Sequence, residues 1–190
     1  MASQTDICNI ALQKLGAGKI SNLSEDSRIA RACNIAYTHC VEAELRAHPW
    51  RFAIQRASLA ADATAPDWGK ANAFELPSDF LRLLTPYPDD NYNDIDYEIE
   101  GRKIYSNMDD PLYIRYVSQV TDTSLMDPTF REVVACRMAI QMCEDLTQSN
   151  AKAATVQAQY EKAIKEARRA NAIESIAQVP PEDTWVTVRD

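Results

Sequence analysis

The chain has 190 residues, of which 46% are hydrophobic, enough for one globular domain or one domain with an insertion. This composition excludes wholesale disorder. The formal net charge of −8 is the opposite of that in most nucleic-acid readers, which neutralise phosphates with basic side chains. The sequence has neither a basic leader nor an apolar run long enough to cross a bilayer. We therefore expect no signal peptide and no membrane span.

The five cysteines form neither a C-x-x-C pair nor an even set. Cys33 and Cys40 are seven residues apart on one expected helix, as are Cys136 and Cys143 on another. Two helical turns separate such thiols by roughly 10 Å, too far for a disulfide. We therefore expect all five, Cys8 included, to be reduced packing residues of a protein made in a reducing compartment.

Hydrophobic residues at helical spacing predict four helices, at about 3–16, 25–48, 129–148 and 151–176. Gly16 suits a left-handed C-terminal cap of the first helix, and Ser24 can cap the second. The third helix is apolar almost all round. Its narrow polar stripe predicts the most buried helix of the set and comprises Arg137, Gln141, Glu144 and Asp145.

The stretch HPWRFAIQR at 48–56 is where the hydrophobic period changes. The second helix must end near His48, because Pro49 forces the preceding residue out of the α region. A half-buried strand is expected next, from the alternation of Trp50, Phe52 and Ile54. Catalysis by His48 needs a positioned partner, and His39 lies nine residues earlier on the same helix. A structural corner is therefore the better interpretation, with a partly charged imidazole favoured by the helix dipole.

Residues 97–120 predict a small antiparallel meander. A hairpin turning at Gly101-Arg102 would place Ile99 opposite Ile104 and Glu100 opposite Lys103. After a turn at Asp109-Asp110-Pro111, LYIRYVSQV alternates as a third strand.

These elements predict an α+β fold that is mainly α, a four-helix-type bundle with an inserted antiparallel β region. The bundle would be one discontinuous domain of residues 1–48 and 127–177, and 49–126 would be the β-rich insertion. Residues 178–190 would form an extended C-terminal arm, because Pro180-Pro181 cannot continue the last helix.

The sharpest metal candidate is the acidic loop 89–100. It offers oxygen ligands at calcium-loop positions 1, 3, 5 and 12, from Asp89, Asn91, Asn93 and Glu100. Position 6 is Asp94 where such a loop needs glycine, and Pro86 and Pro88 forbid the entering helix. A solvated acidic loop is therefore favoured, and we assign no metal ligand.

Glu98 and Glu100 alternate on one strand face and could be a glycosidase carboxylate pair. Adjacent acids on exposed hairpins are common, so we assign no catalytic or cofactor-binding residue. Two groups are candidates for a partner interface. The first is a basic face of the last helix, which also reads as a solvated face: Lys162, Lys165, Arg168 and Arg169. The second is the C-terminal arm, with Trp185, Val188 and Arg189.

The order of these pieces resembles the tail tubular protein A family, the head-to-tail adaptors of short-tailed bacteriophages and related prophages. The series begins with DICNIALQKLGAGKISNLSEDSRIARACNIAY, LRAHPWRFAIQR and FELPSDFLRLL. It continues with YEIEGRKIY, LYIRYVSQVTDTSLMDPTFREVVACRMA and the final DTWVTVRD. The most telling pieces are the HPWRFA corner, the YEIEGRKI hairpin and the D-P-T-F helix entry.

The resemblance implies a structural virion protein, not an enzyme, made in the bacterial host cytoplasm and located at the head-to-tail junction. Family members form a ring, typically of twelve copies, under the portal protein. The ring extends the DNA channel without sequence-specific binding and is the platform for a tail nozzle protein of the tail tubular protein B type. The family fold is a helical bundle with a β-rich insertion, and no cofactor or membrane contact is implied. The alternative is a carboxylate-dependent glycan hydrolase acting during infection. A DNA-binding packaging subunit is opposed by the charge.

Overall fold

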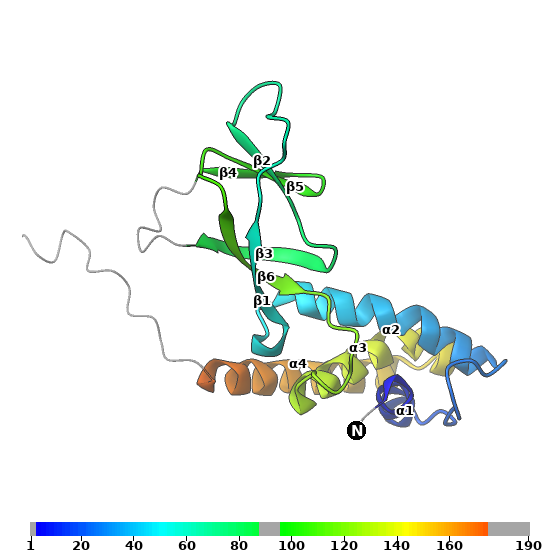
Figure 1. Ribbon diagram of the computed structural model, residues 1–190. Coiled ribbons are helices and arrows are strands. Elements are labelled where there is room, and N and C mark those ends of the chain that lie inside the picture. Colours follow the sequence, from blue (N-terminus) through cyan, green and yellow to red (C-terminus); the bar gives the residue numbers. More distant parts are fainter. Residues whose placement is uncertain (1–2, 88–95, 175–190) are drawn as a thin grey trace, which may run out of the picture.

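A computed structural model describes residues 3–87 and 96–174 (Figure 1). This part of the chain contains four α-helices: α1 (Gln4–Leu15), α2 (Arg28–Ala47), α3 (Pro128–Thr147) and α4 (Asn150–Ile173). A short 3₁₀ helix covers Arg51–Ala53. The strands are β1 (Ile54–Leu59), β2 (Asn72–Glu75), β3 (Phe80–Tyr87), β4 (Tyr97–Glu100), β5 (Lys103–Ser106) and β6 (Leu112–Ser118). No described helix combines the length and the apolar character that a membrane span requires.

The helix boundaries follow local capping. Ser3 and Asp6 form a reciprocal capping box at the start of α1, and Gly16 ends that helix in the left-handed conformation, as predicted. The cap of α2 is Ser27 and not Ser24, so this expectation was wrong by three residues. Asp127 caps α3 directly before Pro128, whose missing N–H is no loss in the first turn.

The helix α3 is the centre of the helical layer. The other three helices all pack against it, whereas α1 makes few contacts with α2 or α4. Its buried residues cover most of its circumference, so the prediction that this is the most buried helix is confirmed. Figure 1 shows α1 end-on beneath the lengthwise helices α2 and α4.

The strands form two separate antiparallel sheets of three strands each. Sheet A has the order β1-β6-β3, and sheet B has the order β2-β5-β4. In sheet A, β6 pairs with β1 on one side and with β3 on the other. Both strands precede β6 by more than twenty residues in the sequence, and β2 lies between them along the chain. Sheet B lies beyond sheet A, at the far end of the molecule from α4 (Figure 1).

The predicted fold class is therefore wrong. The protein is not a four-helix-type bundle with a small inserted β region, because four helices accompany two three-stranded antiparallel sheets in a strand-rich arrangement. The helix ranges agree with the prediction to within a few residues, since helical periods are local. The error arose from residues 72–87, where Pro77 interrupts the strand pattern between β2 and β3. These two strands form by pairing with β5 and β6, which come later in the chain.

The predicted meander over 97–120 is also wrong, although its hairpin is confirmed. Ile99 pairs with Ile104 and Glu100 with Lys103 across the Gly101-Arg102 turn. The third strand leaves this sheet because β6 is apolar on both faces. Ile114 belongs to the sheet core and Val117 to the helical core, so β6 takes the central place in sheet A.

The alternation at 50–54 was likewise misread as a strand. Residues 51–53 form the 3₁₀ turn, and the strand starts only at Ile54. The predicted arm 178–190 lies outside the described residues.

Candidate functional site

An aromatic cluster joins the corner after α2 to the start of α3. The ring centroid of Phe130 lies 5.1 Å from that of Trp50 and 5.0 Å from that of Phe52. Trp50 is almost fully buried and donates its indole N–H to the carbonyl of Glu44 at 2.8 Å. The corner is therefore part of the helical core, as the structural interpretation of HPWRFA expected.

His48 lies at this corner and is held by Asn171 of α4. The Asn171 Nδ2 atom is 3.1 Å from His48 Nε2, and the Asn171 carboxamide oxygen accepts from the Arg51 backbone N–H at 2.8 Å. Burial, then Arg168 and Arg82, lower the pKa of His48. The expectation of a partly charged imidazole favoured by the helix dipole is therefore wrong, because burial first, and then the two guanidinium groups, disfavour the charged form.

Arginine side chains gather where sheet A meets the C-terminal half of α4. A cavity of about 330 Å³ is lined by Arg51, Arg115, His48 and Asn171, among others. A second cavity of the same size shares Arg115 and adds Arg56. We call this surface the arginine corner and define it by five residues: Arg51, Arg56, Arg82, Arg115 and Arg168.

None of these five arginines forms an ion pair with a carboxylate within residues 3–87 and 96–174. Arg56 and Arg115 are direct cross-strand partners in β1 and β6. Like charges in this position destabilise a sheet by a few tenths of a kcal/mol to about 1 kcal/mol. The arginine corner therefore concentrates unpaired positive charge in a protein of net charge −8.

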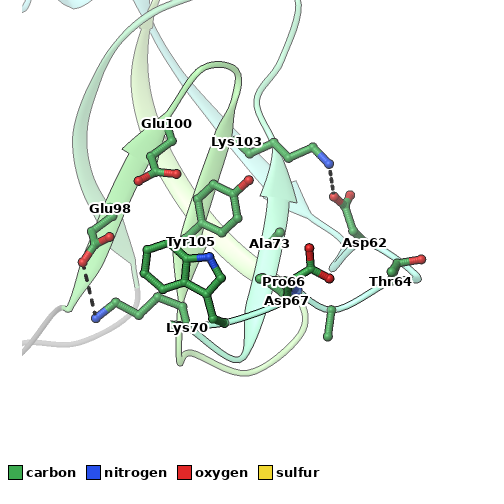
Figure 2. Close-up of a pocket in the computed structure, with 13 residues that line it drawn as sticks. Asp62, Thr64, Pro66, Asp67, Lys70, Ala73, Glu98, Glu100, Lys103 and Tyr105 are labelled. Carbon is green, nitrogen blue, oxygen red and sulfur yellow. Dashed lines mark hydrogen bonds and ion pairs between the residues drawn. The ribbon is translucent and has the colours of Figure 1, made fainter.

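The second candidate surface lies on sheet B and on the loop that precedes β2. A cavity of about 380 Å³ is bordered by acidic residues of β4 and of this loop. Figure 2 shows Glu98 and Glu100 on one side, Asp62 and Asp67 on the other, and Tyr105 between them. We call this surface the acidic cavity and define it by six residues: Asp62, Asp67, Trp68, Glu98, Glu100 and Tyr105.

Two lysines offset part of its charge. Lys103 binds Asp62 with 2.6 Å between Nζ and a carboxylate oxygen, and Lys70 lies 3.9 Å from a Glu98 oxygen (Figure 2). Asp67 and Glu100 have no ion pair among the described residues. The Trp68 side chain is 86% exposed, the most exposed of the large hydrophobic side chains in this part of the chain.

A buried polar network links three helices. Glu44 on α2 is 1% exposed and accepts from Arg137 of α3 at 2.6 Å and from the Tyr160 hydroxyl of α4 at 2.7 Å. Burial followed by the bond to Glu44 raises the pKa of Tyr160. Because the carboxylate is satisfied from two sides and enclosed, this network holds the helices together rather than binding a ligand.

The five cysteines are all buried and free, as expected. A hydrogen bond with Cys33, followed by burial, raises the pKa of Cys8. Burial raises the pKa of Cys40 to about 11. The same hydrogen bond with Cys8 lowers the pKa of Cys33. The raised pKa values of Cys8 and Cys40 disfavour the reactive thiolate form at those two residues, and burial of all five thiols agrees with their role as packing groups.

The predicted interface residues lie in two places. Lys162, Lys165, Arg168 and Arg169 are all exposed on α4, and Lys162 is 3.9 Å from Glu166. Of these four residues, Arg168 is part of the arginine corner. Trp185, Val188 and Arg189 lie outside the described residues, as does most of the acidic loop 89–100.

The metal candidates gain no support from the described residues, and the catalytic candidates gain only their shared place in the acidic cavity. No three His, Cys, Asp or Glu side chains within 3–87 and 96–174 form a group that could hold a metal ion. Glu98 and Glu100 are exposed on a strand whose four residues are all exposed.

The sequence interpretation missed the arginine corner and the Glu44 network. The corner draws its arginines from four stretches of the chain, at residues 51–56, 82, 115 and 168, so no local pattern predicts it. Two arginines on predicted or observed strands, Arg56 on β1 and Arg115 on β6, could have indicated it. They can be recognised as neighbours only once the pairing of the two strands is known. The network was hidden for the same reason, since Glu44, Arg137 and Tyr160 occupy three different helices.

No family model matches the chain, and the search of curated proteins likewise finds no match. The assignment to a family therefore stays the resemblance described from the sequence.

Proposed function

We propose that this chain is a structural virion protein, a head-to-tail adaptor that forms a ring under the portal of a short-tailed bacteriophage. The ring extends the DNA channel and carries the tail nozzle protein. The proposal starts from the resemblance of the ordered sequence pieces to the tail tubular protein A family. The fold expected from that resemblance was wrong, so the support comes from the pieces themselves.

The observation that carries the proposal is the aromatic cluster of Trp50, Phe52 and Phe130. It joins two of the three most telling pieces, the HPWRFA corner and the D-P-T-F helix entry, which are more than seventy residues apart. A chance likeness of loose patterns does not require the pieces to pack together. Because the two pieces pack against each other in the helical core, they belong to one structural unit, and this supports the resemblance to the family.

The exposed surfaces also suit a subunit with several neighbours. The arginine corner and the acidic cavity both open to solvent, and Trp68 and Ile173 are large apolar side chains left exposed on different elements. Exposed aromatic and arginine side chains are typical of interface anchors. The glycan hydrolase has less support. Glu98 and Glu100 do line the acidic cavity, but both lie on a fully exposed strand and Glu98 lies near Lys70.

The test is assembly with the portal protein of the same phage or prophage. Alone, the protein is expected to be a monomer or a weak assembler, whereas mixing with the portal yields a stable complex in light scattering. Electron microscopy of that complex should show a closed ring of copies below the portal. Absence of any complex across a range of salt concentrations contradicts the proposal.

A deletion of residues 180–190 tests whether the C-terminal arm makes the contact with the portal protein. We expect the truncated protein to melt at nearly the same temperature and to lose assembly on the portal. Trp185→Ala should weaken assembly by a few kcal/mol at most, the range of a single interface anchor. Normal assembly of the truncated protein would place the portal contact elsewhere.

A further inference from the structure

We propose that the arginine corner of one copy of this chain binds the acidic cavity of a second copy, head to tail. This inference rests on the proposed ring and names the contact between its subunits. It starts from two surfaces whose charges are left partly or wholly unpaired within the described residues: the five arginines of the corner, and Asp67 and Glu100 of the cavity. No part of it depends on the C-terminal arm.

The arginine corner is built from groups that repel one another. Arg56 and Arg115 face each other directly across two strands, and Arg82 and Arg168 both act on His48 from different elements. A negatively charged partner removes this repulsion and gains charge-assisted hydrogen bonds. The open cavities of about 330 Å³ beside Arg115 give a side chain of the partner room to enter.

The acidic cavity has the chemistry that recognises a guanidinium group. Carboxylates accept its paired N–H donors, and the faces of Trp and Tyr rings attract it through cation–π contact. Glu100 and Asp67 have no ion pair in the described parts of the chain, and the Trp68 indole is 86% exposed beside them. A cavity of about 380 Å³ can take at least one arginine side chain of the partner.

A second copy of this chain is the occupant that the charges favour. Nucleic acid is disfavoured, because the protein as a whole carries a charge of −8 and repels polyanions. A protein surface with a few carboxylates is not disfavoured in this way, because its negative charge is confined to the contact and does not extend along the rest of the partner. The chain itself carries such a surface, with aromatic rings suited to arginine.

One copy cannot satisfy both of its own surfaces. The acidic cavity lies on sheet B and its loop, whereas Arg168 belongs to α4 at the opposite end of the molecule (Figure 1). The contact is therefore between copies and joins two different surfaces. Such a contact leaves one surface of each kind free, so it continues to further copies and forms a ring when the rotation closes.

Charge reversal tests the pairing without the portal. One variant carries Arg56→Glu and Arg115→Glu in the corner, and the other carries Glu98→Lys and Glu100→Lys in the cavity. Sedimentation velocity at high protein concentration should show salt-sensitive self-association of the unmodified protein. We expect each variant alone to self-associate at least about tenfold more weakly.

Mixing the two variants should restore association. Each native surface then meets a native partner, and each reversed surface meets a reversed partner. A single chain with all four substitutions should also self-associate again. The matched control for the corner variant is Arg28→Glu with Arg31→Glu, which changes the net charge by the same amount at two exposed arginines outside the corner and should leave association unchanged. Circular dichroism establishes that every variant is folded.

Three results overturn the inference: no salt-sensitive self-association of the unmodified protein, no recovery on mixing folded variants, or an equal loss in the control. Binding of duplex DNA that the corner variant alone abolishes, with self-association unchanged, would also overturn it in favour of nucleic acid. The portal experiment separates the two proposals. Recovery on mixing without a portal complex contradicts the adaptor function alone, and portal rings formed normally by both variants contradict this contact alone.

Discussion

The helical layer and the two sheets differ in how they are stabilised. The helical core gathers residues from all four helices together with Trp50, Ala53 and Val117, and the enclosed Glu44 network holds it further. The sheet core is small and lies around Phe74, Ile104 and Ile114. At the edge of sheet B, every residue of β4 is exposed.

This difference teaches where binding surfaces can form. Regions with few buried apolar contacts open more easily and tolerate exposed charge, whereas a dense core does not. The acidic cavity lies on the thinly packed sheet B, and the arginine corner lies where sheet A meets the helices. The helical layer therefore acts as the stable base, and the candidate contacts lie on what it supports.

The largest expected effect on stability is that of Trp50→Ala, which is compared with Trp68→Ala because Trp50 is buried and Trp68 is exposed. Trp50→Ala removes a buried ring and its indole hydrogen bond, and we expect a loss of about 3 to 5 kcal/mol in the free energy of unfolding. Trp68→Ala, at an exposed ring, should change it by no more than about 0.5 kcal/mol. Urea denaturation measures both, and equal losses would contradict the assignment of Trp50 to the helical core.

Ile104→Ala probes the smaller core. Ile104 is fully buried between the strands of sheet B and the rest of the sheet core, so we expect a local loss of about 2 to 4 kcal/mol. Hydrogen exchange should show lower protection of amides in β2, β4 and β5 and unchanged protection in α3. If α3 loses protection to the same extent, the two cores unfold as one unit and the comparison fails.

Glu44→Gln tests the polar network of the helical layer. The substitution removes the charge that compensates Arg137, and we expect a loss of about 1.5 to 3 kcal/mol. Glu132→Gln is the matched control, because Glu132 is half exposed in its ion pair with Lys14 and should cost less than about 1 kcal/mol. Thermal unfolding compares them, and an inverted order would show that the network is not enclosed.

The smallest effect concerns pH. The folded-state pKa of His48 is lowered, so the unfolded chain binds more protons below the ordinary pKa of 6.5. Its contribution to stability is thus present above pH 6.5 and is lost as the pH falls toward the folded-state pKa. Subtracting the stability of His48→Gln from that of the unmodified protein isolates this slope from the titration of carboxylates. A difference that grows as the pH falls would contradict it.

Helices, caps and the hairpin were accessible from the sequence because their signals are local. The spacing of Ile7, Ala11 and Leu15, the position of Gly16 and the Gly101-Arg102 turn each act over a few residues. The strand predicted from the alternation at 50–54 was wrong for an instructive reason. Trp50, Phe52 and Ile54 alternate with Arg51 and Ala53 as in a strand, yet residues 51–53 form a 3₁₀ turn, and the rings of Trp50 and Phe52 both pack on Phe130.

The sequence by itself determined the positions of the four helices, the burial of α3 and the identity of one hairpin, because periodicity and turn chemistry are local properties of the chain. Only the tertiary structure decided that β6 would leave that hairpin and become the centre of sheet A, with Ile114 and Val117 on opposite faces. The arginine corner has the same origin. Its charges are distributed between residues 51 and 168 and become one surface only through strand pairing and the packing of α4, since long-range contacts leave no period in the sequence.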